Sequence, residues 1–168
     1  MITPDRNPLE ILKSALLLEM RGRSFYSKVA AQTDKESVKA FFTMMAEEEE
    51  QHVRELSKQY KAYKAEGAFV PSETDTQNRE VADKVMTEGL KKQIDAAGFE
   101  AAAVAAAMSM EERAIRLYSD QAKAAASTEE RAIYHWLADW ERRHLEMLAE
   151  IDRDLTEDVW NDNNFWPF

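Results

Sequence analysis

Two Glu-x-x-His motifs stand out among the residues whose types and spacing could do chemistry. A Glu and a His three positions apart lie on one face of an α-helix, so each motif can offer a carboxylate oxygen and an imidazole nitrogen to one metal ion. A further Glu precedes the Glu of each motif by the same interval of 30 residues. The candidate metal ligands are Glu19, Glu49, His52, Glu111, Glu141 and His144.

The six candidate ligands belong to an internal repeat. A shift of 92 residues, without any gap, superimposes the three ligands of the first half on the three of the second half. The same shift pairs Tyr26 with Tyr118 and Leu56 with Leu148, so it preserves packing positions as well as polar ones. A chance match would not keep a Glu, a Tyr and a Glu-x-x-His together, and the chain therefore carries two copies of one unit.

The helical period of the apolar residues predicts the elements that position these ligands. Four long helices are predicted over residues 8–31, 34–66, 99–126 and 127–154. Short connections make two antiparallel hairpins, 8–66 and 99–154, and the crossover 67–98 between them carries a predicted accessory helix over 79–94. We expect residues 1–155 to form one all-α domain, a ferritin-like four-helix bundle, and residues 156–168 to form an aromatic, non-helical tail that docks onto the bundle or a partner subunit.

Local signals predict three helix ends, which belong to two of the helices. Thr33 with Glu36, and Ser127 with Glu130, have the spacing of a capping box at a helix start. Gly67 is a natural helix stop, because glycine adopts the left-handed conformation that ends many helices.

The hairpins bring the candidate ligands to one level of the bundle. Glu19 precedes the first turn, near Thr33, by about as many residues as Glu49 and His52 follow it, which places all three roughly 22–27 Å from the turn. The second hairpin repeats this geometry. An unpaired buried carboxylate costs several kcal/mol or becomes protonated. Two divalent cations would balance four carboxylates, so the sequence predicts a two-metal site, the alternative being two buried Glu–His ion pairs without metal.

Tyr26 and Tyr118 lie one layer from the ligands, toward the turns of the hairpins. Each is either a core aromatic with a satisfied hydroxyl or a hydrogen-bond donor to a ligating carboxylate, and we favour the second role. A redox role for the phenols is a further option.

The repeat also separates ligands from neighbouring polar residues. In the acidic run 47–50 only Glu49 has both a His three residues later and a repeat partner, so Glu47, Glu48 and Glu50 are expected to be solvated or at the rim. The same offset favours Glu111 over Glu112. Three aromatic or imidazole side chains are expected on the surface, in packing or at an interface: His135, Trp136 and Trp140.

Composition limits the function classes. The net charge of −10 repels phosphate backbones and argues against nucleic-acid binding. The absence of cysteine excludes disulfides and cysteine-ligated iron within this sequence, and it favours iron or manganese over structural zinc. The longest apolar stretch, 101–108, is too short for a membrane span, and residues 1–6 lack a signal-peptide pattern, so the expected location is cytoplasmic.

These motifs resemble those of the rubrerythrin-like branch of the ferritin superfamily, over about residues 8–154. The resemblance implies a di-iron centre in a homodimer, with a possible exchange of helices. Many members of that branch reduce hydrogen peroxide while their irons cycle between ferrous and ferric, and the resemblance implies the same activity here. The roles it implies are terminal or semi-bridging for Glu19 and Glu111, bridging for Glu49 and Glu141, and terminal for His52 and His144.

Two departures from that family matter. Peroxide-reducing rubrerythrins carry an additional carboxylate three residues after the first Glu of the third helix, where this chain has Ala114, and the repeat-equivalent position is Gly22. A ligand switch based on that carboxylate is therefore in doubt. The sequence also lacks a cysteine-rich rubredoxin domain, so the resemblance implies a separate electron-donor protein.

Three functions are consistent with the predicted centre. The first is an oxidoreductase that reduces hydrogen peroxide or dioxygen at two iron ions. The second is iron handling, in which the protein oxidises ferrous ion and stores or delivers it. The third is a metal-stabilised scaffold that holds zinc or manganese. Fast oxidation of the ferrous protein by peroxide favours the first, and turnover of many irons per chain favours the second.

Overall fold

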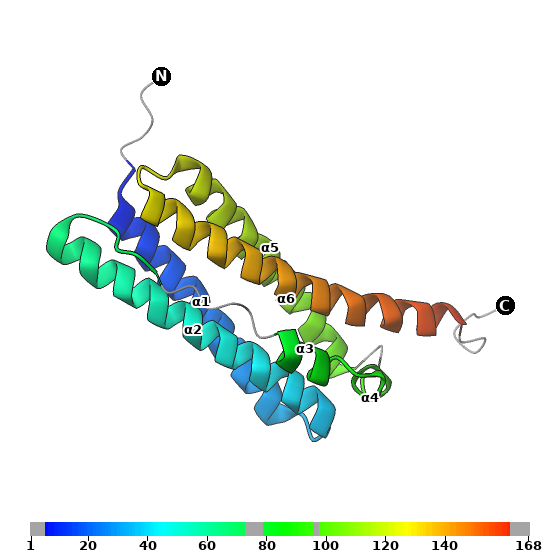
Figure 1. The fold of residues 1–168 in the computed structure, drawn as a ribbon. Coiled ribbons are helices and arrows are strands. Elements are labelled where there is room, and N and C mark those ends of the chain that lie inside the picture. Colours follow the sequence, from blue (N-terminus) through cyan, green and yellow to red (C-terminus); the bar gives the residue numbers. More distant parts are fainter. Residues whose placement is uncertain (1–5, 73–78, 96–97, 162–168) are drawn as a thin grey trace.

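The computed structural model describes residues 6–72, 79–95 and 98–161, and its regular structure there is helical (Figure 1). The predicted all-α, ferritin-like bundle is confirmed. The helices are α1 (Pro8–Gln32), α2 (Glu36–Glu66), α3 (Arg79–Val85), α4 (Glu88–Lys92), α5 (Phe99–Ala124) and α6 (Thr128–Asn161). None of the helices in these ranges has a stretch apolar enough to cross a bilayer.

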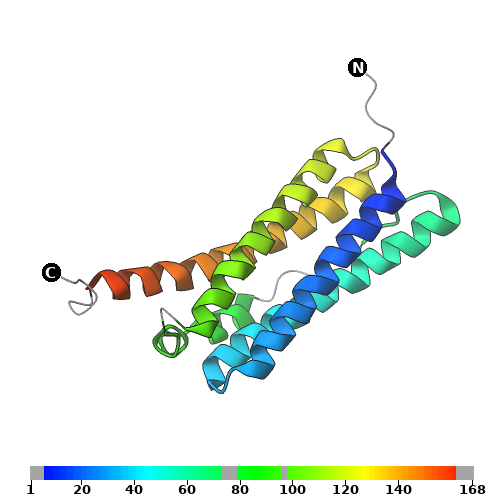
Figure 2. The same cartoon turned by 180° about the vertical axis from the view of Figure 1, so that it is seen from behind.

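The four long helices form two antiparallel hairpins, α1–α2 and α5–α6, that pack side by side (Figures 1 and 2). The short helices α3 and α4 belong to the crossover, where both contact α2 and α4 also contacts α6. The backbones of the two helices within each hairpin lie close together over most of their length, whereas the backbones of different hairpins come close at fewer places. The packing between hairpins therefore depends more on side chains in the middle of the bundle.

A polar layer divides the core into two apolar clusters. On the side of the α1–α2 turn, buried residues such as Phe41, Phe42 and Leu148 pack together. On the other side, residues such as Leu12 and Leu137 form the second cluster. Each long helix passes from one cluster to the other through the layer that holds the predicted ligands, so apolar packing on both sides fixes the depth of that layer.

Two of the predicted helix ends are present. Gly67 ends α2 with a φ of 70°, and its N–H donates to the Tyr63 carbonyl. The Ser127 hydroxyl oxygen accepts a hydrogen bond of 3.1 Å from the Glu130 N–H at the start of α6. The Glu130 carboxylate accepts from the N–H of Ala126, which completes a variant of the predicted capping box.

The capping box predicted at Thr33 is wrong. The helix begins at Glu36 with Lys35 as its N-cap, and no side chain caps it. The buried Thr33 hydroxyl instead donates to Glu100 at 3.1 Å, which ties the α1–α2 turn to the first turn of α5. The Glu100 carboxylate is buried, so leaving it without a hydrogen-bond donor would cost free energy. The hydrogen bond from Thr33 to Glu100 therefore stabilises the fold more than a cap on the helix would.

The accessory helix and the end of the last helix also differ from prediction. The segment expected as one helix is divided into α3 and α4, because Thr87 caps a new helix by accepting a 3.3 Å bond from the Leu90 N–H. Helix α6 runs to Asn161 rather than ending near Asp154, and the buried Leu155 continues its apolar face. The first part of the expected tail is therefore helical, and the predicted docking of residues 162–168 lies outside the described residues.

Candidate metal centre

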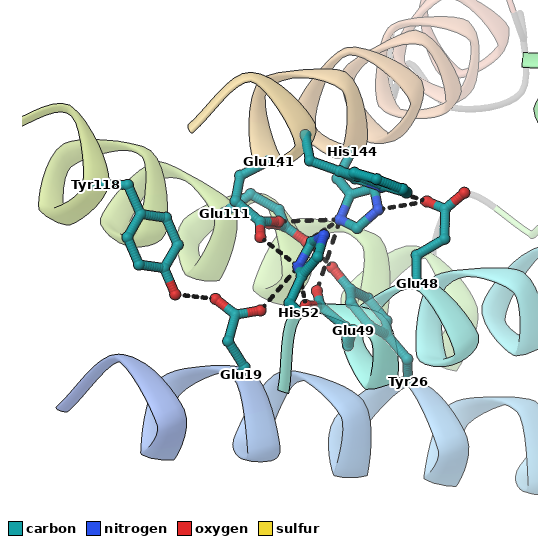
Figure 3. Close-up of polar contacts among 10 residues, drawn as sticks. Glu19, Tyr26, Glu48, Glu49, His52, Glu111, Tyr118, Glu141 and His144 are labelled. Carbon is teal, nitrogen blue, oxygen red and sulfur yellow. Dashed lines mark hydrogen bonds and ion pairs between the residues drawn. The ribbon is translucent and has the colours of Figure 1, made fainter. Parts of the chain in front are cut away.

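All six candidate ligands converge on the polar layer in the middle of the bundle, and each is at most 3% exposed (Figure 3). Helix α1 contributes Glu19 and α2 contributes Glu49 and His52, while α5 and α6 contribute the repeat equivalents Glu111, Glu141 and His144. On α1 the buried stripe runs through Ala15 and Gly22 on either side of the glutamate, so ordinary helical periodicity turns the carboxylate inward.

Both histidines present Nδ1 to the carboxylates. His52 Nδ1 lies 3.0 Å from Glu19 Oε2, 3.1 Å from Glu49 Oε2 and 2.8 Å from Glu141 Oε1. His144 Nδ1 lies 3.0 Å from Glu141 Oε2 and 3.4 Å from Glu111 Oε1. The same ring nitrogen is therefore available for coordination in both halves.

The ligand atoms form two overlapping groups. The first group consists of Glu19, Glu49, His52 and Glu141, and in each group the ligand atoms lie within 4.8 Å of one another. The second group consists of Glu49, Glu111, Glu141 and His144. Glu49 and Glu141 belong to both groups, so the two groups share two carboxylates.

The residues present fit a pair of cations. Both carboxylate oxygens of Glu141 and the Nδ1 atom of His144 are buried and have no hydrogen-bond partner in the part of the chain that the structure describes, although they lie close to other polar atoms of the cluster. Buried polar groups normally have partners, because a lost hydrogen bond to water is costly. Oxygen and imidazole donors in this number suit two divalent ions, which would satisfy the orphaned atoms.

Without cations, the layer keeps protons that free side chains would lose. Burial and the neighbouring Glu141 carboxylate raise the pKa of Glu19 well above its usual value, and burial with the same neighbour does so for Glu111. Burial lowers the pKa of His52 and His144, but the surrounding carboxylates outweigh it and both pKa values end well above normal. Protons therefore take the place of positive charge in this layer.

Each tyrosine reaches across to the opposite hairpin. The Tyr118 hydroxyl of α5 donates to Glu19 of α1, and the Tyr26 hydroxyl of α1 donates to Glu111 of α5 (Figure 3). Burial, together with the carboxylate that each one faces, raises the pKa of both phenols well above 10. Both tyrosines therefore stay protonated, and each O–H orients one glutamate of the centre.

Glu48 corrects the expectation that it is solvated or at the rim, because only 6% of its surface is exposed. Its Oε2 accepts hydrogen bonds from His144 Nε2 at 2.6 Å and from the Trp140 indole N–H at 3.0 Å (Figure 3). The carboxylate thereby fixes the histidine tautomer that leaves Nδ1 free for a metal. The 92-residue shift pairs Glu48 with Trp140, so an acid in one half stands where the other half has an indole donor. This difference between the halves was the signal in the sequence for the buried contact of Glu48.

The other neighbours lie largely where the sequence placed them. Glu47, Glu112 and His135 are exposed, and Glu50 is half-buried in an ion pair with Arg23. Three aromatic rings meet on the α2–α6 side, where the Trp136 and Trp140 rings contact the His52 ring edge-on, with centroids 5.4 and 5.1 Å away. Both indoles thus pack around the histidine, and Trp140 also donates to Glu48.

The two halves differ at the outer nitrogen of each histidine. His144 Nε2 bonds to Glu48, whereas His52 Nε2 is buried and has no hydrogen-bond partner among the described residues. The aromatic rings of α6 cover that side of His52 instead. The repeat therefore gives the centre approximate twofold symmetry. The hydrogen bond between Glu48 and His144 breaks this symmetry.

Comparison with known proteins agrees with this geometry. The sequence model of the rubrerythrin family matches residues 10–152, which includes most of each of the four long helices and all six clustered residues. No curated protein and no solved structure matched the chain. A match over most of the sequence, together with a buried carboxylate–histidine cluster that fits two metal ions, shows that the chain belongs to the rubrerythrin family.

Proposed function

We propose that the centre holds two iron ions and that the protein reduces hydrogen peroxide or dioxygen, using electrons from a separate donor protein. The observation that carries this proposal is the pair of overlapping ligand groups, which share Glu49 and Glu141 in a buried layer. Shared carboxylates would hold two ions close together, and two redox-active ions supply the two electrons that peroxide reduction needs.

The donor set supports iron more than structural zinc. Carboxylates outnumber histidines in both groups, and the sequence has no cysteine to provide a thiolate. Such oxygen-rich sets with some imidazole suit iron or manganese, whereas structural zinc sites use cysteine and histidine. Manganese remains the second choice on these grounds.

The protein residues would position and protect this centre. The hydroxyls of Tyr26 and Tyr118 hold Glu111 and Glu19 in place and retain their protons. Trp140 and Glu48 close the α2–α6 side around the histidines, so water has little access from there. Exclusion of water from that side strengthens the electrostatic effect that the bound ions would have there.

The test begins with metal analysis of protein purified from iron-replete cells, which should show two irons per chain. The anaerobic ferrous protein is then mixed with hydrogen peroxide in a stopped-flow spectrometer, and separately with dioxygen. We expect oxidation by at least one of these oxidants to be much faster than for free ferrous ion. Equal rates for bound and free iron would end the proposal.

A control variant distinguishes the centre from adventitious iron. Glu141→Ala removes a carboxylate shared by both ligand groups and should abolish fast oxidation, while Glu112→Ala on the exposed face of α5 should not. Size-exclusion chromatography of the loaded protein tests the proposed homodimer. Oxidation of many irons per chain with retention of the ferric product would instead favour iron handling.

A further inference from the structure

A cavity of about 270 Å³ lies against the metal centre, between α1 and α5. In Figure 2 these two helices run side by side in front of α2 and α6, the helices that carry His52 and His144, and α1 and α5 are also in contact. The carboxylates of the centre line one end of the cavity, including Glu49 and Glu141. Arg21 and Arg113 line it as well, and because both are exposed the cavity reaches the surface.

The cavity lies on the approximate twofold axis of the repeat. With one exception, Phe25, its lining residues form pairs related by the 92-residue shift. The pairs are Leu18 with Met110, Glu19 with Glu111, Arg21 with Arg113, Gly22 with Ala114, and Glu49 with Glu141. The space is therefore a feature of how the two hairpins meet.

Small residues keep the cavity open. Gly22 and Ala114 are buried at the positions facing the centre, and a Cβ at Gly22 would already lie 3.5 Å from the Glu49 carboxylate. Longer side chains at either position would occupy the space beside the bridging carboxylates. The walls farther out are apolar, since Leu18, Phe25 and Met110 form them.

The cavity is much larger than the oxidants considered above. One water molecule needs about 10–15 Å³ of such space, so the cavity exceeds what hydrogen peroxide requires by about tenfold. Its size approaches the lower end of pockets that bind small organic molecules, and its mixture of apolar walls with a few polar groups is typical of them.

The mouth is positively charged in an acidic protein. Arg21 and Arg113 form no ion pair with any other residue in the described part of the chain, although the net charge is −10. Two free guanidinium groups beside an apolar cavity attract a molecule that has an apolar body and a negatively charged end.

We propose that this cavity binds an organic hydroperoxide, whose apolar body fills the space between α1 and α5 and whose anionic group faces Arg21 and Arg113. The proposal rests on the proposed function. The O–O bond of the hydroperoxide breaks, and the molecule takes up two electrons and two protons to leave as an alcohol and water. Two ferrous ions held by the six clustered ligands would supply the two electrons and become ferric, and the separate donor protein would return the electrons. The protons come from solvent.

The first experiment measures binding without redox chemistry. The zinc-loaded protein is titrated calorimetrically with 4-(2-hydroxypropan-2-yl)benzoate, the alcohol that the para-carboxylate derivative of cumene hydroperoxide yields on reduction. We expect saturable binding to the unmodified protein, and at least about tenfold weaker binding to Ala114→Leu, which fills the cavity. Ala106→Leu makes the same change at an exposed site of α5 and should bind normally. Absence of saturable binding, or equal binding by both variants, overturns the proposal.

The second experiment compares oxidants of the ferrous protein. Cumene hydroperoxide and hydrogen peroxide are tested against the unmodified protein and against Ala114→Leu. We expect the ratio of the two rate constants, organic over inorganic, to fall by about tenfold in the variant, because the smaller oxidant needs less space. Zinc stoichiometry and circular dichroism establish that Ala114→Leu is folded and loaded. A fast reaction with hydrogen peroxide but none with cumene hydroperoxide refutes the inference and leaves the proposed function intact.

The arginines are tested with a matched pair of substrates. Cumene hydroperoxide is compared with its para-carboxylate derivative in a double variant, Arg21→Gln with Arg113→Gln, whose exposed positions should tolerate the change. We expect the rate with the anionic substrate to drop about three- to tenfold at low salt and to lose its salt dependence, while the neutral substrate reacts as before. Equal effects on both substrates contradict the role of the arginines.

Discussion

Glu48 shows how one residue makes two similar metal positions unequal. Its carboxylate accepts from His144 Nε2, which polarises the imidazole and holds Nδ1 toward the centre. The same hydrogen bond lowers the pKa of Glu48 although burial alone raises it, so the group is ionised. His52, at the equivalent place in the other half, has no such acceptor among the described residues. The ion beside His144 should therefore be bound by the stronger imidazole donor.

Replacement of Glu48 by glutamine should weaken one metal position selectively. Glu48→Gln removes the negative charge behind His144, and loss of such a contact typically costs about 10–100-fold in metal affinity. Calorimetric titration with zinc should show one site weakened and the other nearly unchanged. Glu47→Gln, at the adjacent exposed position, is the matched control and should leave both sites intact. Equal weakening of both sites would contradict the asymmetry.

The protons held by the ligands make metal binding depend on pH. The pKa values of Glu19, Glu111, His52 and His144 lie well above normal, so each group holds its proton to a higher pH than a free side chain does, and an ion must displace that proton. Affinity should therefore rise as pH increases and fall as it decreases. Zinc added to weakly buffered protein near pH 7 should release protons, detected with an indicator dye. A binding reaction without proton release would show that the ligands are already deprotonated.

At the scale of the helices, contacts far apart in sequence account for what local patterns could not predict. The four long helices were predictable because their apolar period is strong, and Gly67 and Ser127 marked ends that depend on neighbouring residues. The burial of Glu48 depends on a tryptophan 92 residues away, and the bond of Thr33 depends on Glu100. The residues next to Glu48 or Thr33 in the sequence do not indicate these distant partners. The convergence of the six ligands was predictable because the repeat supplied long-range information that a single helix lacks.

Gln59 fastens the beginning of the crossover to α2. Its buried side-chain amide donates to the Val70 carbonyl at 3.0 Å and accepts from the Val70 N–H at 3.1 Å, so it satisfies both backbone groups of that residue. The adjacent Phe69 packs its ring against Tyr63 and Tyr134. One polar side chain thus sets where the chain leaves the first hairpin and contacts the second.

Removal of that amide should destabilise the fold without emptying the metal centre. Gln59→Ala leaves the Val70 groups without their partner and should lower the free energy of unfolding by about 1–3 kcal/mol, measured by urea denaturation. Metal stoichiometry should be unchanged, because Gln59 lies two turns beyond His52. Lys61→Ala, on the exposed face of the same helix, should have little effect. An effect no larger than that of Lys61→Ala would show that water replaces the amide.

For the molecule as a whole, the proposed metal centre would act as a cross-link between the two repeated hairpins. Backbone contacts are concentrated within each hairpin, whereas each ligand group takes residues from both. Without cations, four buried carboxylates share one layer and are held by protons and by the histidines. Bound ions would replace that arrangement with direct links from α1 and α2 to α5 and α6. Stability and metal content should therefore be coupled.

Metal binding should raise the free energy of unfolding, and the shared ligands should matter most. Free metal at 100 times the dissociation constant adds about 2.7 kcal/mol for each site, measured by urea denaturation with excess zinc and with a chelator. Glu19→Gln damages one ligand group and should lose about half of the gain, whereas Glu141→Gln damages both groups and should lose most of it. Because Glu141 belongs to both ligand groups and Glu19 to only one, equal losses in the two variants would contradict a shared centre and indicate two independent sites.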